Sequence, residues 1–122
     1  MLSEHFSEDE FACHCCGGLT EINPRLIDLL EELRYNIGGY PLTINSGYRC
    51  EINNEACGGV PNSQHVLGNA ADVACPEELE FGEFKWYCEQ LPFDGIGIYE
   101  DDNFIHLDTR SGGVGAGYFW EG

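Results

Sequence analysis

Apolar residues recur at helical spacing after Asn23, and this segment is the clearest element of the chain. Asn23 can cap a helix, and Pro24 suits the first helical position, where the missing N–H costs nothing. Gly38 and Gly39 would end the helix. One face of this predicted helix carries a stripe of leucines: Leu26, Leu29, Leu30 and Leu33.

Two further helices and several strands follow from the same kind of pattern. Ser7 and Glu10 have capping-box spacing, and Pro76 opens a third predicted helix in which Trp86 is expected to be a core residue. Apolar and polar residues alternate in "PLTIN", "NAADVAC" is mostly apolar, and "GIGIYEDDNFIHLDT" has the pattern of a hairpin. Helices combined with hairpin-linked strands predict an α+β fold, with a central antiparallel sheet and helices packed on one side.

Length and charge restrict the function classes. The chain has 122 residues, which suits a single domain over residues 1–122. Its net charge of -17 argues against a basic surface for nucleic acid or anionic lipid. No apolar run is long enough to cross a bilayer, so we expect no membrane insertion. We expect a monomer. Because the first residues lack a signal-peptide pattern, we also expect that the protein is made in the cytoplasm.

Histidine and aspartate residues around the predicted strands indicate a metal site. Catalytic zinc usually has three protein ligands and one open position. His65 precedes the strand that contains Asp72, and His106 lies in the hairpin, which makes these three the candidates. Alternation places Asp108 on the same face as His106, where it could orient an imidazole or reach a zinc-bound water. The alternative is that these histidines are hydrogen-bonded core residues.

Arg49 is a second candidate functional residue, because it precedes the metal motif in a chain with only five basic residues. It could bind a substrate carboxylate or stabilise an oxyanion. The alternative is a surface ion pair with one of the many acidic residues.

The motifs "SGYRC", "GGVPNSQHVLGNAADV", "GIGIY" and "FIHLDTR" resemble the zinc D-alanyl-D-alanine carboxypeptidase family. Members are peptidoglycan peptidases that share a metal site with the Hedgehog signalling domain, and the chain is most similar to the compact branch associated with phages and prophages. The resemblance implies a Hedgehog/DD-peptidase-like fold and one catalytic zinc held by His65, Asp72 and His106. It also implies that Arg49 faces the substrate.

The activity implied by the resemblance is metal-assisted hydrolysis of peptidoglycan peptides, as in an endolysin. Many members carry an acid or a histidine three residues before the last ligand, where this chain has Asn103. Asp101, Asp102 and Asp108 are therefore the candidates for the base, and Asp108 is equally a candidate for orienting a ligand. Candidate substrate contacts are Ser63, Arg49 and Trp120, although Trp120 and its aromatic neighbours could instead cap the core.

Four of the seven cysteines form two groups: one pair with C-x2-C spacing lies near the start of the chain, and the other two lie in the loop ahead of the metal motif. They could hold a second, structural zinc, form disulfides, or be small buried residues with no bond. These four are Cys13, Cys16, Cys50 and Cys57.

Several functions remain open at this level. The bond cleaved could be that of a DD-carboxypeptidase, a DD-endopeptidase or an L-alanyl-D-glutamate endopeptidase. A protein made without a signal peptide would reach the cell wall after holin-type release, or as a phage or prophage product. The alternatives to an enzyme are a non-catalytic, zinc-stabilised module that binds cell wall or protein, and a cysteine-rich structural metalloprotein.

Overall fold

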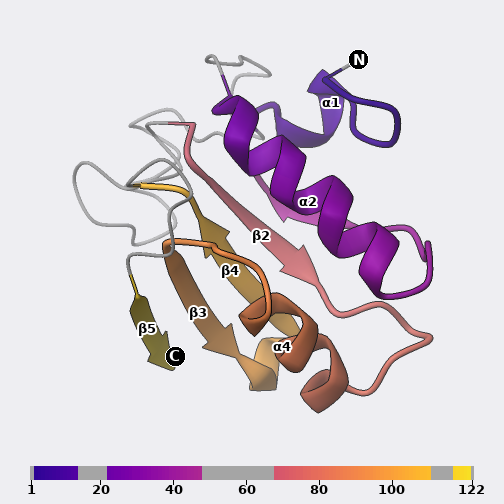
Figure 1. The fold of residues 1–122 in the computed structure, drawn as a ribbon, viewed down its shortest axis with the longest axis vertical. Coiled ribbons are helices and arrows are strands. Elements are labelled where there is room, and N and C mark those ends of the chain that lie inside the picture. Colours follow the sequence, from indigo (N-terminus) through magenta and orange to yellow (C-terminus); the bar gives the residue numbers. More distant parts are fainter. Residues whose placement is uncertain (1, 14–21, 48–67, 111–116, 122) are drawn as a thin grey trace.

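The computed structural model describes residues 2–13, 22–47, 68–110 and 117–121. Helices α2 and α4 lie over the same side of a twisted sheet (Figure 1). The helical elements are α1 (Glu8–Phe11), α2 (Pro24–Asn36), α4 (Phe81–Glu89) and the 3₁₀ turn η1 (Glu100–Asp102). The strands are β1 (Ile44–Ser46), β2 (Ala70–Ala74), β3 (Gly95–Tyr99), β4 (Phe104–Asp108) and β5 (Tyr118–Glu121). The α+β class is confirmed.

The described strands form one sheet in the order β1-β2-β4-β3-β5. The first three pairings are antiparallel, and β3–β4 is the predicted hairpin. The fourth, between β3 and β5, is parallel, so the expectation of a purely antiparallel sheet was wrong. The reason is the order of the strands in the sheet. Strand β5 is antiparallel to β4, but it pairs with β3, which is itself antiparallel to β4, so β5 and β3 are parallel.

Helix α2 forms as its sequence predicts. The side chain of Asn23 accepts a hydrogen bond of 3.0 Å from the backbone N–H of Arg25, and this caps the helix. The chain leaves the helix through Gly38 and Gly39, both in left-handed conformations that glycine adopts readily. The predicted leucine stripe is buried against the sheet.

Helix α4 differs from its prediction in two respects. It begins at Phe81 and not near Pro76, because a capping box between Glu80 and Glu83 sets its first turn. Trp86 is 56% exposed, so its assignment to the core was wrong. The buried face of the helix is made by Phe84 and Cys88, four residues apart, and Trp86 lies between them on another side.

Alternation along the strands divides the sheet into two faces. The face that packs on α2 and α4, here called the helix face, belongs to the hydrophobic core. It contains Ala71, Val73, Ile96, Ile98, Ile105 and Leu107. The opposite face, here called the polar face, contains Asp72, His106 and Asp108 from the intervening positions. In the part of the chain that is described, no helix combines the length and the apolar character that a membrane span requires.

Candidate metal centre

One register row crosses the whole sheet on the polar face. Each residue of the row lies opposite the next one on the neighbouring strand. In strand order, the row is Ser46, Asp72, His106, Gly97 and Trp120. Facing side chains on paired strands lie close enough to interact directly. The sheet therefore brings together residues that are far apart in the sequence.

Asp72 and His106 form the centre of this row. The Oδ1 atom of Asp72 lies 3.0 Å from Nδ1 of His106. Both residues are nearly excluded from solvent, with exposed fractions of 9% and 8%. Strands β2 and β4 fix the pair, since the two residues are direct partners in the antiparallel register. Two of the three predicted metal ligands are thus adjacent.

The second nitrogen of His106 also faces a carboxylate. Its Nε2 atom lies 2.9 Å from Oδ2 of Asp108, two residues along the same face of β4. Arg110 binds the same carboxylate in a fork: Nε donates to Oδ1 at 3.0 Å and Nη2 donates to Oδ2 at 2.6 Å. The backbone N–H of Arg110 donates a further bond to Oδ1. Both oxygens of Asp108 are therefore engaged.

These contacts shift two pKa values. Burial by itself would raise the pKa of Asp108, but hydrogen bonds from His106 and Arg110, together with the charge of His106, lower it to about 2. Burial would lower the pKa of His106, but the hydrogen bonds and charges of Asp108 and Asp72 outweigh burial and raise it. A carboxylate with so low a pKa is a weak proton acceptor near neutral pH. Its surroundings suit the orientation of an imidazole better than they suit general-base catalysis.

Two glycines of β3 leave space for functional side chains. A Cβ atom at Gly95 would overlap the carboxylate of Asp108. A Cβ atom at Gly97 would lie 2.6 Å from Cε2 and Nε1 of Trp120. The "GIG" pattern therefore has two roles, because its isoleucine joins the core and its glycines accommodate the groups around His106. A glycine in a strand often marks a place that another group approaches closely.

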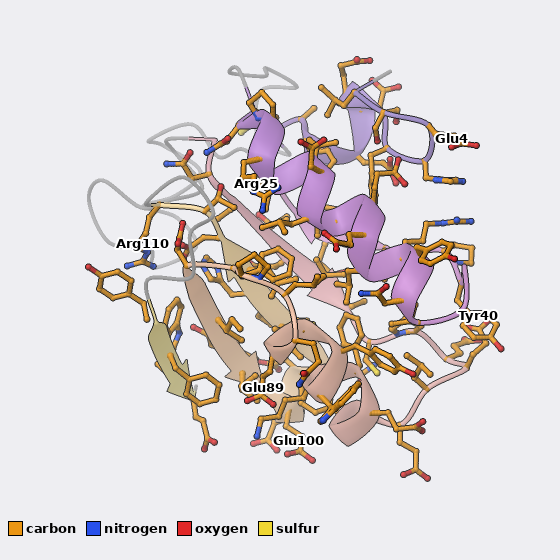
Figure 2. All side chains as sticks on the ribbon, viewed as in Figure 1. Glu4, Arg25, Tyr40, Glu89, Glu100 and Arg110 are labelled. Atoms are coloured by element: carbon orange, nitrogen blue, oxygen red, sulfur yellow. The ribbon has the colours of Figure 1, made fainter. Side chains whose placement is uncertain are left out.

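Trp120 from β5 is a further described residue beside His106. Its ring centroid lies 5.1 Å from that of His106, with a tilt of 48° between the planes. Its Nε1 donates a 3.0 Å hydrogen bond to the hydroxyl of Tyr99. The guanidinium carbon of Arg110 lies 5.5 Å from the Trp120 ring and 4.7 Å from the Tyr118 ring. Figure 2 shows Arg110 at the end of β4 that adjoins the start of β5.

Asp102 belongs to the exposed turn η1, between the two strands of the β3–β4 hairpin. Asn103 ends that turn in a left-handed conformation, which interrupts the strand period. Glu100, in the same turn, lies at the opposite end of β4 from Arg110 (Figure 2). Asp102 is therefore not aligned with His106 along the strand.

Several predicted site residues lie outside the described residues. They are Arg49, Ser63, His65, Cys16, Cys50 and Cys57. Cys13 is described and buried, and the predictions of a structural metal site and of disulfides stay untested. Sequence reasoning missed Arg110, although it quoted the motif "FIHLDTR", and the roles of Gly95 and Gly97. Alternating glycines within a strand were the available signal.

The donor set fits zinc as far as it is described. Two ligand atoms on one tetrahedral zinc ion are separated by roughly 3.3 Å, and Asp72 Oδ1 and His106 Nδ1 are 3.0 Å apart. A carboxylate on the other imidazole nitrogen, as Asp108 provides here, typically accompanies a metal-bound histidine. No group of three potential ligands is found among the residues with described positions, and His65 is not one of these.

Comparison with known proteins extends these observations. The family profile described as Peptidase M15 matches residues 4–108. The zinc D-Ala-D-Ala carboxypeptidase of Streptomyces albus G is 41% identical over 44 residues, which are 36% of this chain and 17% of that protein. The peptidoglycan L,D-endopeptidase MepK of Shigella flexneri is 31% identical over 111 residues, which are 86% of this chain and 58% of that protein.

The chain spans less than two thirds of the length of either relative. The family profile, by contrast, covers most of the chain, from Glu4 to Asp108. The matched segment includes Asp72 and His106 as well as Asp108. This chain belongs to the Peptidase M15 family.

Proposed function

We propose that this protein is a zinc-dependent peptidase that hydrolyses peptide bonds of bacterial peptidoglycan. The observation that carries the proposal is the Asp72–His106 pair, with Asp108 on the second nitrogen of the imidazole. Family membership supports peptidase activity, and the names of the relatives support zinc and a peptidoglycan substrate. His65 is the proposed third ligand.

The described residues have distinct proposed tasks. Asp72 and His106 would hold the ion, which when bound supplies a Lewis acid and an activated water. Asp108 orients the imidazole of His106, and Arg110 fixes Asp108 through the bidentate fork. This orienting role is favoured over that of a general base because one oxygen of Asp108 faces the imidazole and both oxygens accept hydrogen bonds from Arg110. The assignment of Asp102 as the general base stays a prediction. An Asp102→Asn variant that retains zinc but loses turnover would support this assignment.

The substrate side of the proposal concerns two residues that lie outside the described residues. Arg49 is proposed to bind a substrate carboxylate or an oxyanion, and Ser63 to contact the substrate. The longer of the two matches is to an L,D-endopeptidase, so cleavage within peptidoglycan peptides is the first specificity to examine. Holin-type release and a phage or prophage origin stay predictions.

The test is the release of fragments from purified peptidoglycan sacculi, analysed by mass spectrometry. We expect the full chain to release peptide-bearing fragments, a chelator to abolish release, and added zinc to restore it. His65→Ala and His106→Ala should behave like the chelated protein. Equal fragment release with and without chelator would exclude a zinc peptidase. Binding to sacculi without release would instead indicate the non-catalytic binding module.

A further inference from the structure

We propose that Trp120 is a positioning residue for His106 and that Gly97 and Tyr99 hold its indole in place. The inference rests on the proposed function, because it concerns how a metal-binding imidazole is held. It differs from the expectation that Trp120 contacts substrate, because it assigns the indole to a contact within the protein. Three independent contacts support it.

The first contact is between the rings of Trp120 and His106, and the missing side chain of Gly97 makes room for it. Gly97 lies opposite both His106 on β4 and Trp120 on β5. A side chain at this position would separate the two rings, and a Cβ atom would already lie 2.6 Å from the indole. Because glycine has no side chain, the indole extends across the strand to within 5.1 Å of the imidazole, measured between centroids. The glycine is thus what permits an edge strand to reach the site.

The second contact fixes the polar edge of the indole. Nε1 of Trp120 donates to the hydroxyl of Tyr99 at 3.0 Å. The ring of Tyr99 is itself stacked on Phe104, with centroids 4.7 Å apart and planes 6° from parallel. A partly buried indole N–H usually requires such an acceptor. The anchor therefore holds the indole in one orientation relative to β4.

The third contact links Trp120 to the carboxylate cluster. The guanidinium carbon of Arg110 lies 5.5 Å from the Trp120 ring, and Arg110 also holds Asp108. Asp72 and Asp108 define the directions of the two ring nitrogens of His106. The terminal torsion of a histidine is broad, so contacts at the edge leave the tilt of the ring less defined. The indole supplies the wall that limits this tilt.

The test measures the dissociation constant of Zn²⁺ by competition with a chromophoric chelator, using the full chain. Trp120→Ala should weaken zinc binding about tenfold, the lower end of the range for residues that orient metal ligands. Trp120→Phe should recover part of the loss, because an aromatic wall remains. Gly97→Ala removes no functional group and should weaken binding as Trp120→Ala does, since the added methyl displaces the indole.

Two matched controls are available on α4. Trp86→Ala removes an exposed tryptophan, and Gly82→Ala adds a methyl that meets nothing within 4 Å. Both should keep the zinc constant of the wild type within twofold. The visible absorption of the Co²⁺-substituted protein gives a second readout. It should change in Trp120→Ala and stay unchanged in Trp86→Ala.

The outcomes separate this inference from the proposed function. A wild type that fails to bind zinc overturns both. A wild type that binds zinc, with Trp120→Ala binding equally well, overturns only the role of Trp120. If Trp120→Ala raises KM and leaves kcat and the zinc constant unchanged, Trp120 is a substrate contact and the positioning role is overturned. If Trp120→Ala does not fold, Tyr99→Phe is the alternative, because it removes only the hydroxyl that accepts from Trp120. An unchanged zinc constant and Co²⁺ spectrum in Tyr99→Phe would overturn the role of this hydrogen bond.

Discussion

The helix face and the polar face of the sheet are built from alternate residues of the same strands. On β4, Ile105 and Leu107 are fully buried in the core, whereas His106 and Asp108 are held by hydrogen bonds and charge. On β3, the isoleucines join the core, and the glycines accommodate Asp108 and Trp120. Neighbouring residues therefore have different tasks, and only the strand alternation separates them.

The difference shows where stability and chemistry reside. Burying a leucine or isoleucine side chain contributes about 2 kcal/mol, and the helix face collects many such contributions. A buried ion pair contributes less than its bare attraction, because desolvation offsets much of that attraction. The polar face must instead satisfy geometric demands, such as the space that Gly95 leaves for a carboxylate. Adjacent substitutions on one strand should therefore separate loss of activity from loss of stability.

The largest effect is expected from His106→Ala. The proposed function makes this imidazole a metal ligand, and a catalytic metal contributes several kcal/mol to the transition state, so turnover should fall by roughly 10³-fold or more. Peptide release from sacculi measures the turnover, and equilibrium dialysis measures bound zinc. A variant with intact turnover would contradict the assignment of His106.

Leu107→Ala tests the other face at the adjacent position. Leu107 is 0% exposed in the core, so the truncation should lower the free energy of unfolding by about 3 kcal/mol. Urea denaturation measures this loss. The folded variant should keep its zinc affinity and turnover within about threefold. A variant that loses turnover while it keeps its stability would break the proposed division between the two faces.

Asp108→Asn should reveal the pH dependence of the carboxylate cluster in chelated protein. The pKa of Asp108 is lowered from 3.8 to about 2 in the folded protein. Its ionised form therefore stabilises the fold above about pH 4, and this contribution of about 2 kcal/mol is lost as the pH falls through 2. We expect the stability difference between wild type and variant to grow from pH 2 to pH 4. A difference that is constant over this interval would contradict the assignment.

Asn23→Ala should have the smallest effect, because Asn23 belongs to the boundary between the two layers. Its Oδ1 caps α2, and its Nδ2 donates to Asn69 and to the backbone of Thr109, next to Asp108. Loss of the cap should cost about 1 kcal/mol, measured by thermal denaturation. Zinc affinity should change by less than twofold. A larger change would show that the end of α2 helps to position the site.

Much of the local structure followed from the sequence. The cap and leucine stripe predicted α2, the capping box predicted α1, and alternation predicted the β3–β4 hairpin. The same alternation placed Asp108 beside His106. These predictions were accurate because each depends on neighbours within one element, where backbone geometry alone decides the spacing.

Other features required the tertiary structure. The parallel pairing of β5 depends on which surfaces meet, and the local sequence pattern does not specify this. The same holds for the fork of Arg110 and for the contact between Trp120 and His106, which join the end of β4 to a strand formed later in the chain. The sequence by itself determined α1, α2 and the β3–β4 hairpin, and which residues of the hairpin strands share a face. Only the folded sheet decided which of those residues touch, because register and strand order are set by packing across the whole domain.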